Sequence, residues 1–503
     1  MKTAFSTATF AALAMLSVVG CDDKSKSGAP TTSSSAGAPS ASGTDAPIEL
    51  KLLVTADEDG HIVSEAGKGG AAELAGQWMK DEKHCVGAAC EGSDTLAMST
   101  GDHFSGAAIS SFYEGASTAA VMNAMGYRAT ALGNHDLDFG EDVFAKLVAT
   151  TGAQVVAANV APRAGGTLAK TLVPTTVLTR KGVKIAVVGL ASIDTAKTTM
   201  ADRFVGTTFS PYEAALAEAV PKAWKDGADA VVVLAHECPD VFEPMFSKHA
   251  DWHVSLVAGA HCETDVSKTA GTTQLASCGR HFEQYLRAKL TIDKSKPMGE
   301  RVKAVSAERV AVKGTSLDPA VKSIVDTWKS KHDADLAQAI GFSGKALAKD
   351  STELQHVILG SLRKQLSADI ALANKAAFRG AIPAGVVTKA SIYGAIPYEN
   401  SVLIASIAGD ALAKELARET AVFDGASGSM KNGFQVGGKP IDPKKKYKVA
   451  TLDFLYFGGD GFELEKLDPS PIETGMVWET PVIDFLKKNP TTAAMPLEAL
   501  AKK

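Results

Sequence analysis

The stretch Gly133–Gly140, which reads GNHDLDFG, decides how the fold and the site of this chain are interpreted. It follows the strand-like run Ala129–Leu132. Four polar side chains share the loop: Asn134, His135, Asp136 and Asp138. An amide oxygen is a good ligand for a hard metal ion, an adjacent histidine can transfer a proton or hold an oxyanion, and a nearby carboxylate can orient that histidine. Because turns rich in Asn and Asp are common, the loop indicates a metal site only if further ligands lie beside it.

Further candidate ligands follow other apolar runs. The runs and their polar residues are Ile48–Thr55 before Asp57 and Asp59, Thr95–Thr100 before Asp102, Ala129–Leu132 before Asn134, Ala228–Ala235 before His236, and Val254–Ala260 before His261 and Glu263. Taken singly, an Asp after a strand is typical of a turn and a His is typical of a hydrogen-bonded surface residue. In an open α/β sheet, however, the carboxyl ends of parallel strands lie at one edge. Together these strand ends predict one site.

The order of these residues resembles that of the calcineurin-like metallophosphoesterases, and most closely their 5′-nucleotidase branch. The resemblance implies an α/β fold with an N-terminal αββα sandwich and a pair of divalent metal ions bridged by Asp102. It implies the remaining ligands as Asp57, Asp59 and Glu263 for the first ion and Asn134, His236 and His261 for the second. His135 and Asp138 match the family's catalytic pair, which stabilises the phosphoryl transition state while a metal-activated hydroxide attacks phosphorus.

The first metal position departs from the family pattern. Where the family has Asp-x-His, this chain has Asp57–Glu58–Asp59, so either Asp59 replaces the histidine or His61 enters from two residues further on. We favour Asp59 because it keeps the ligand spacing. Glu263 stands where the family has His or Gln. If both carboxylates bind, the first position is all-oxygen, which favours Mn²⁺ or Mg²⁺ over Zn²⁺. Among Mn, Zn, Co and Mg, we therefore expect at least one Mn-like position.

Beyond about residue 340 a second set of motifs appears. It comprises Ala368–Asn374 followed by Lys375–Arg379, then Ile396–Asn400, and then Val449–Phe454 with Gly458–Gly461. These resemble, in order, the loops of the 5′-nucleotidase C-terminal domain, an α/β recognition domain. The resemblance assigns the substrate-binding roles as follows: Tyr398 and Phe454 sandwich the base, Asp460 accepts from ribose hydroxyls, Arg379 meets phosphate, and Asn374 belongs to the same loop as Arg379. The family's further arginines are missing near residues 349–353, and the next one, Arg363, falls in a predicted helix.

The chain of 503 residues is long enough for more than one domain. We expect a signal peptide at 1–20, a lipid-anchored flexible linker at 21–47, a catalytic domain at 48–310, a connector at 311–339 with a helix near Pro319–Gln338, and a recognition domain at 340–503. The signal segment ends in Val18–Cys21, which resembles a bacterial lipobox and predicts lipidation of Cys21. The alternative is ordinary signal cleavage.

The other cysteines leave several pairings open in an oxidising compartment. Cys85 and Cys90 are close enough to close a short loop, which leaves Cys238, Cys262 and Cys278 with one unpaired thiol among them. Because Cys238 and Cys262 lie beside predicted ligands, thiolate ligation is one interpretation. A disulfide between them, or from either of them to Cys278, is the interpretation we prefer.

We therefore expect an extracytoplasmic, membrane-anchored phosphohydrolase that removes phosphate from nucleotides. Two variants of the same chemistry stay open, a 2′,3′-cyclic-nucleotide phosphodiesterase and a UDP-sugar hydrolase, because only the recognition domain separates them. A different alternative is a catalytically weak lipoprotein that binds a nucleotide or a metal. A net charge of −5 and the lack of a basic cluster beyond Lys444–Lys446 give no reason to expect nucleic-acid binding. We treat the chain as a monomer.

Overall fold

The computed structural model describes residues 46–64, 67–86, 93–197, 203–262, 264–398 and 400–502. The predicted signal peptide, Cys21 and nearly all of the predicted linker lie outside these ranges, and so do Cys90 and Glu263. Within the described part of the chain, no helix combines the length and the apolar character that a membrane span requires.

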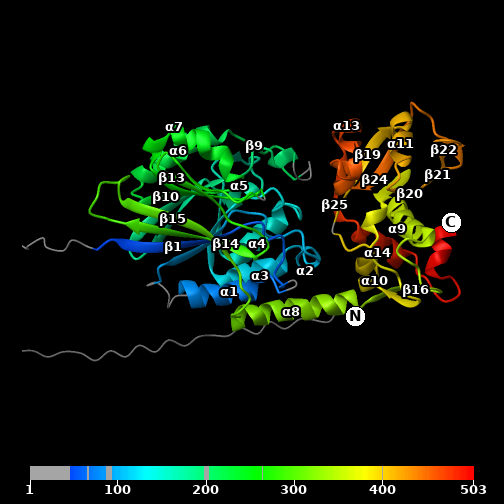
Figure 1. Ribbon diagram of the computed structural model, residues 1–503, viewed down its shortest axis with the longest axis horizontal. Coiled ribbons are helices and arrows are strands. Elements are labelled where there is room, and N and C mark those ends of the chain that lie inside the picture. The colour runs from blue at the N-terminus through cyan, green and yellow to red at the C-terminus, as the bar shows by residue number, and fades with distance from the viewer. Residues whose placement is uncertain are drawn as a thin grey trace, which may run out of the picture. The chain divides into compact units, whose positions relative to one another are not determined.

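Two sheets form the N-terminal half of the described chain (Figure 1). The strand order of the first is β15-β14-β1-β2-β3-β4-β6, and that of the second is β12-β13-β11-β10-β8-β7. The first sheet contains β1 (Ile48–Thr55), β2 (Thr95–Ser99), β3 (Tyr127–Ala131), β4 (Gln154–Val156), β6 (Leu172–Val173), β14 (Gln284–Ile292) and β15 (Val302–Ala311). The second contains β7 (Thr175–Arg180), β8 (Val183–Leu190), β10 (Ala230–Ala235), β11 (Val254–Gly259), β12 (Ser267–Ala270) and β13 (Thr273–Ser277).

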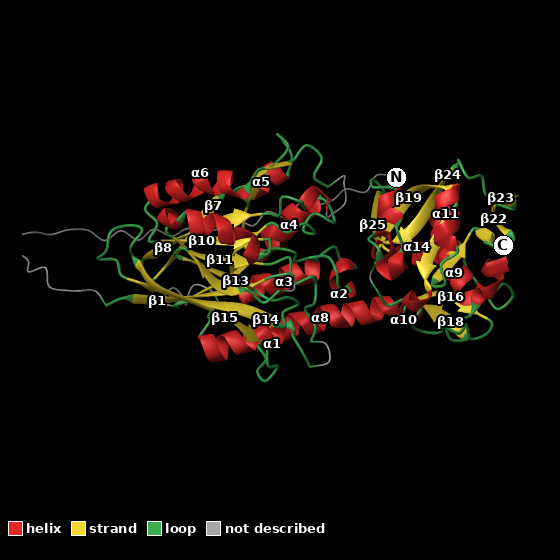
Figure 2. Cartoon of the chain, turned by 45° about the horizontal axis from the view of Figure 1, so that its top comes forward, coloured by secondary structure: helices red, strands yellow, loops and turns green. Residues whose placement is uncertain are grey.

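Alternation along the strands explains why the sheets stack. Leu52 and Val54 of β1 pack with Ile185 of β8 in a core between the two sheets, whereas Leu53 points to the opposite face. That opposite face is covered by α1 (Ala71–Gln77), α3 (Ala116–Met125), α4 (Glu141–Thr151) and α8 (Pro319–Leu336). The outer face of the second sheet is covered by α6 (Tyr212–Lys225) and α7 (Glu243–Lys248). The layers therefore run helix, sheet, sheet, helix, as Figure 2 lets the reader follow. Shorter elements complete this half: α2 (Ala108–Ser111), α5 (Leu168–Thr171), β5 (Val160–Ala161) and β9 (Thr208–Phe209).

The C-terminal half is built on a sheet of the order β20-β17-β24-β19-β25. Its strands are β17 (Ile370–Asn374), β19 (Ser401–Ala408), β20 (Ala421–Asp424), β24 (Lys446–Leu452) and β25 (Ile472–Val477). One face packs on α9 (Thr352–Gln365) and α14 (Glu479–Lys488), and the other on α11 (Gly409–Leu416), α12 (Asp453–Tyr456) and α13 (Leu464–Leu467). The remaining strands and α-helix are β16 (Ala339–Ser343), β18 (Gly385–Thr388), α10 (Lys389–Ala395), β21 (Ala426–Ser429), β22 (Gly433–Val436) and β23 (Lys439–Pro440).

The strand predictions agree with the structure to within two residues at either end, since all five apolar runs form β1, β2, β3, β10 and β11. The predicted connector helix is α8, which starts at Pro319 behind the cap residue Asp318 and ends at Leu336. The predicted run Val449–Phe454 divides, because β24 stops at Leu452 and α12 begins at Asp453. Phe454 is therefore presented by a helix that starts directly after a strand.

Candidate active site

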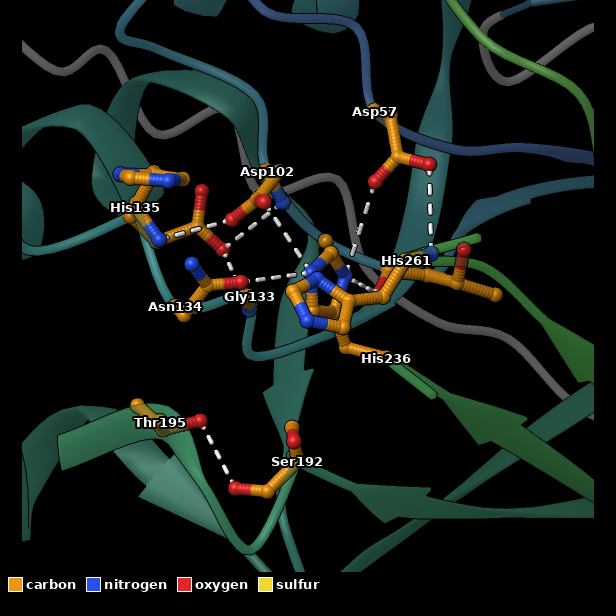
Figure 3. Close-up of polar contacts among 12 residues, drawn as sticks. Asp57, Asp102, Gly133, Asn134, His135, Ser192, Thr195, His236 and His261 are labelled. Carbon is orange, nitrogen blue, oxygen red and sulfur yellow. Dashed lines mark hydrogen bonds and ion pairs between the residues drawn. The ribbon is translucent and has the colours of Figure 1, made fainter. Parts of the chain in front are cut away.

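The carboxyl ends of the predicted strands meet at one edge of the two-sheet sandwich. β1, β2 and β3 run parallel in the first sheet, and β8, β10 and β11 run parallel in the second. Asp102 follows β2, His236 follows β10 and His261 follows β11, and their ligand atoms lie within 4.8 Å of one another. Figure 3 shows them converging with Asp57 and Asn134. The sequence argument from strand ends thus places these five residues together.

His236 shows how closely the candidate ligands are fixed. Its Nδ1–H donates to the carbonyl oxygen of Thr100 at 3.0 Å, so the other nitrogen, Nε2, faces the site. Nε2 lies 3.0 Å from Asn134 Oδ1 and 3.0 Å from Asp102 Oδ2. The side chain is completely buried. A histidine that donates one N–H to a carbonyl while its second nitrogen points at carboxylate and amide oxygens has the usual arrangement of a metal ligand.

Asp136, in the middle of the Gly133–Gly140 loop, joins two strand ends. Its carboxylate accepts from the backbone N–H groups of His103 at 2.9 Å, Gly133 at 2.8 Å and Asp102 at 3.3 Å. The backbone N–H of His135 in turn donates to Asp102 Oδ1 at 2.8 Å. These contacts hold the loop after β3 against the loop after β2. Asp136 is therefore a positioning residue, whereas its neighbour Asp138 lines the site.

The candidate ligands share an unusual backbone. Asp57, Asp59, Asp102 and His261 have φ values of 44°, 44°, 58° and 58°, in the left-handed region that side chains other than glycine rarely adopt. Such residues persist where surrounding structure holds them, and they cluster at functional sites. The left-handed turns place the carboxylates over the strand ends.

His135 and Asp138 form a pair at the wall of the same cavity. His135 Nδ1 lies 3.1 Å from Asp138 Oδ2, which also accepts from the hydroxyl of Ser105 at 2.7 Å. Burial would lower the pKa of His135, but the hydrogen bond to Asp138 and the charge of Asp102 raise it to about 10. With 45% of its side chain exposed, His135 offers a cationic imidazole to a bound anion.

The acidic residues resist ionising together. Burial raises the pKa of Asp57 to about 7, with the charges of Asp102 and Asp59 acting in the same direction. Burial and Asp102 raise the pKa of Asp59 to about 8. Burial also acts to raise the pKa of Asp102, but the charge and the hydrogen bond of His236 hold this pKa well below its usual range. Asp102 in return raises the pKa of His236 to about 10, against the effect of burial. This donor set fits divalent cations, which would neutralise the carboxylates and displace the proton on His236.

The alternative ligands Asp59 and His61 lie differently. Asp59 lines the cavity with Asp57, Asp102 and His135. His61 stacks on His281, with ring centroids 3.9 Å apart and an interplanar angle of 19°. His281 Nε2 is 3.3 Å from Asp59 Oδ2. The arrangement favours Asp59 over His61, and Glu263 lies outside the described residues.

Sequence reasoning missed Arg280 and His281, which line this cavity from the loop between β13 and β14. Their signal is weak, because the run before them is followed by Cys278–Gly279 and not directly by an Asp, Asn or His. It also missed a buried pair below the site. The carboxylate of Glu58 accepts from His103 Nδ1 at 2.7 Å and from the hydroxyl of Ser99 at 2.9 Å. Glu58, for which the sequence predicts no role, thus anchors the loop that carries Asp57 and Asp59.

A disulfide joins the loops after β10 and β11 through Cys238 and Cys262. This outcome excludes thiolate ligation by either residue and agrees with the interpretation that we preferred. Cys278 is a buried free cysteine. Cys85 is also disulfide-bonded, and the partner predicted for it, Cys90, lies outside the described residues.

The C-terminal half carries a separate cavity of about 300 Å³. It is lined by Asn374, Ala376, Ala377, Tyr398, Asn400, Phe454 and Asp460. Tyr398 and Phe454 are 45% and 48% exposed, a large fraction for aromatic residues. Asn374 Nδ2 donates to Asp460 Oδ2 at 2.8 Å, which joins the first motif of this half to the last.

Arg379 lies beside this cavity and stands over the ring of Tyr398, with its guanidinium carbon 5.7 Å from the ring centroid. The next arginine upstream, Arg363 of α9, donates to Asp424 at 2.6 Å and belongs to a part-buried ion pair. The motif residues predicted for recognition therefore lie together, with Arg379 as the nearby cation.

Comparisons with known proteins agree with this architecture. The family described as "5'-nucleotidase, C-terminal domain" matches residues 332–434. The chain is 23% identical to Protein UshA of Yersinia enterocolitica, over 88% of this chain and 92% of that protein. It is also 23% identical to a 5'-nucleotidase of Vibrio cholerae, over 88% of this chain and 91% of the relative. Among solved structures, the 5'-nucleotidase precursor of Thermus thermophilus has the same fold, with a TM-score of 0.56, 19% identity, and coverage of 88% and 97% of the two chains. The predicted two-domain α/β fold class is confirmed.

Proposed function

Because the chain belongs to the 5′-nucleotidase family, we propose that it is a metal-dependent phosphohydrolase that removes phosphate from nucleotides. The observation that carries this proposal is the convergence of Asp102, His236 and His261, whose ligand atoms lie within 4.8 Å of one another, beside the His135–Asp138 pair. A recognition cavity with two exposed aromatic rings in the other half of the chain supports the choice of nucleotides as substrates.

Two divalent ions are the cofactors that we propose. Asp57 and Asp59 would hold the first ion, Asn134, His236 and His261 the second, and Asp102 both. Bound there, the ions would polarise phosphoryl oxygens and lower the pKa of a coordinated water. The carboxylates around the first position favour a Mn-like ion there. Glu263 remains a proposed ligand from the sequence.

His135 is the proposed catalytic residue beside the metals. The hydrogen bond to Asp138 fixes the ring and favours its cationic form by raising its pKa. A cation held at the cavity wall can pair with a phosphoryl oxygen and can donate its proton to the leaving oxygen. Ser105, through its bond to Asp138, keeps the carboxylate in place.

The aromatic cavity is the proposed base-binding site. Tyr398 and Phe454 are exposed aromatic residues on which any base could stack, and Asp460, which lines the same cavity, would accept from ribose hydroxyls. Arg379, over the face of Tyr398, adds positive charge for the phosphate side of the ligand. We propose a single nucleotide as the ligand.

We propose an extracytoplasmic location for the enzyme, with a lipid anchor at Cys21. The disulfide between Cys238 and Cys262 supports an oxidising compartment, since cytosolic proteins of most bacteria keep their thiols reduced.

The test is phosphate release by metal-stripped protein supplied with Mn²⁺, Zn²⁺, Co²⁺ or Mg²⁺. The substrates are 5′-, 3′- and 2′,3′-cyclic nucleotides, UDP-glucose and an artificial aryl phosphate. We expect strong release from 5′-nucleotides with Mn²⁺. Preference for a cyclic nucleotide or for UDP-glucose would identify one of the related activities instead. If no substrate releases phosphate although metal is shown to be bound, the result would contradict the proposal and favour a lipoprotein that only binds its ligand.

A further inference from the structure

His281 is delivered to the metal edge by a loop that the strand-end argument does not include. The loop connects β13 to β14, and the backbone N–H of His281 donates to the carbonyl oxygen of Asp57 at 2.9 Å. The next residue, Phe282, is completely buried in the N-terminal core. The backbone of His281 is thus bonded to the loop after β1, and the side chain of the next residue is anchored in the core.

The backbone at this position is held in the same unusual conformation as that of the candidate ligands. His281 has φ 55° and Phe282 has φ 52°. Two successive left-handed residues without a glycine cost free energy, so the surrounding structure must hold them there. The conformation sends the imidazole of His281 into the cavity that Asp57, Asp59 and Asp102 also line.

The imidazole of His281 is held by a ring stack and lies close to the carboxylate of Asp59. His61 stacks on it at 3.9 Å between ring centroids, and Nε2 lies 3.3 Å from Asp59 Oδ2. Two ligand atoms in adjacent positions around one ion, each about 2.1 Å from it, are about 3.0–3.5 Å apart. The separation of these two atoms therefore matches that of two ligands of one ion.

We propose that His281 binds the first metal ion through Nε2, beside Asp59. This inference rests on the proposed function. It explains why Asp59 is tolerated where the family pattern has histidine, because the imidazole comes from a different loop. It also changes the expected chemistry of the first position, from an all-oxygen set to carboxylates with one nitrogen, a set that Zn²⁺ and Co²⁺ accept more readily.

The experiment is calorimetric titration of metal-stripped full-length protein with Mn²⁺ and with Zn²⁺. Asn tolerates a left-handed backbone, so His281→Asn removes the imidazole with little change in the loop. His281→Phe keeps the stack on His61 but offers no ligand atom. The matched control is His253→Asn, since His253 is an exposed histidine with φ 50° that lies outside the cavity.

We expect two binding events in the wild-type protein and in the control. In both His281 variants one event should weaken at least tenfold while the other is retained. Diffraction from Mn²⁺-soaked wild-type crystals, at the manganese edge, should place an ion within about 2.4 Å of Nε2. Two unchanged events in the variants, or an ion that Nε2 does not reach, would overturn the inference and leave the proposed function intact. No binding by the wild-type protein would instead contradict the proposed function itself.

Discussion

Asp460, like the candidate metal ligands, adopts a left-handed backbone, with φ 51°. The same conformation thus occurs in both candidate sites, at Asp57, Asp59, Asp102, His261 and His281 in one and at Asp460 in the other. Each such residue costs on the order of 1–2 kcal/mol relative to an ordinary backbone. A sequence indicates left-handed positions mainly through glycine. The residue type of each candidate ligand was therefore predictable, whereas the direction that a left-handed backbone gives to its side chain was not.

At the same scale, His135→Ala tests the division between catalysis and metal binding. The imidazole is paired with Asp138 and is not placed among the converging ligand atoms. We expect kcat to fall by about 10²–10⁴-fold with unchanged metal content, because a general acid or a charged transition-state contact is lost. Turnover and metal content measured on the same preparations give the answer, with His253→Asn, at an exposed histidine outside the cavity, as the control. Loss of metal from the His135 variant would show that His135 is a ligand.

Phe454→Ala tests the aromatic cavity, and Phe457→Ala, at the residue directly after the same short helix, is the control. Both rings are exposed, but only Phe454 lines the cavity. Since base stacking contributes about 1–3 kcal/mol, we expect KM for a 5′-nucleotide to rise by about 5–150-fold in the first variant. KM for an aryl phosphate should stay unchanged in both variants. Equal damage to both substrates would mean that Phe454 supports the fold rather than the base.

At the scale of elements, the fold follows from apolar runs and the site follows from what stands at their ends. Five runs were enough to predict β1, β2, β3, β10, β11 and the edge at which they meet, because parallel strands can carry residues to only one edge. Residues that reach the site through the conformation of a loop could not be predicted from the apolar runs. The contacts of Glu58 with His103 and of His281 with Asp59 join residues 45 and 222 positions apart, and no local pattern encodes them.

Gly133→Ala is the prediction that belongs to the packing of these loops. A Cβ at Gly133 would lie 2.1 Å from Asp102 Oδ1 and 2.3 Å from the Asp102 nitrogen, closer than any real contact. The loop after β3 must then move away from the loop after β2, and we expect metal affinity to fall at least tenfold. Gly394→Ala is the control, because nothing lies within 4 Å of its Cβ position. Calorimetric titration of both variants with metal measures this affinity. Unchanged metal affinity in Gly133→Ala would mean that the two loops accommodate the added methyl group.

At the scale of the whole molecule, the two candidate sites belong to halves with separate hydrophobic cores. The predicted boundaries at residues 310 and 340 fall beside the end of β15 and the start of β16, and the intervening α8 contributes Val321 and Val325 to the core of the N-terminal half. The two motif sets in the sequence predict two sites, and described residues of each set line a separate cavity.

Cys21→Ser is the prediction for the full-length protein in its cell. Without the thiol no lipid can be attached, so we expect the protein to move from the membrane fraction to the soluble fraction. The candidate sites lie far along the chain, and kcat/KM should be unchanged. Fractionation followed by immunoblotting and phosphatase assay measures both. Continued membrane association of the variant would argue against lipidation.

The bond between Cys238 and Cys262 has a practical consequence for anyone who produces this protein. It links the segments that carry His236 and His261, and it closes only where thiols are oxidised. A recombinant preparation made in a reducing cytoplasm would have these two segments untied, at a cost to the folded state of about 3 kcal/mol for a loop of this size. Batches from cytoplasmic and exported expression should therefore differ in bound metal and in heat resistance, although their sequences are the same.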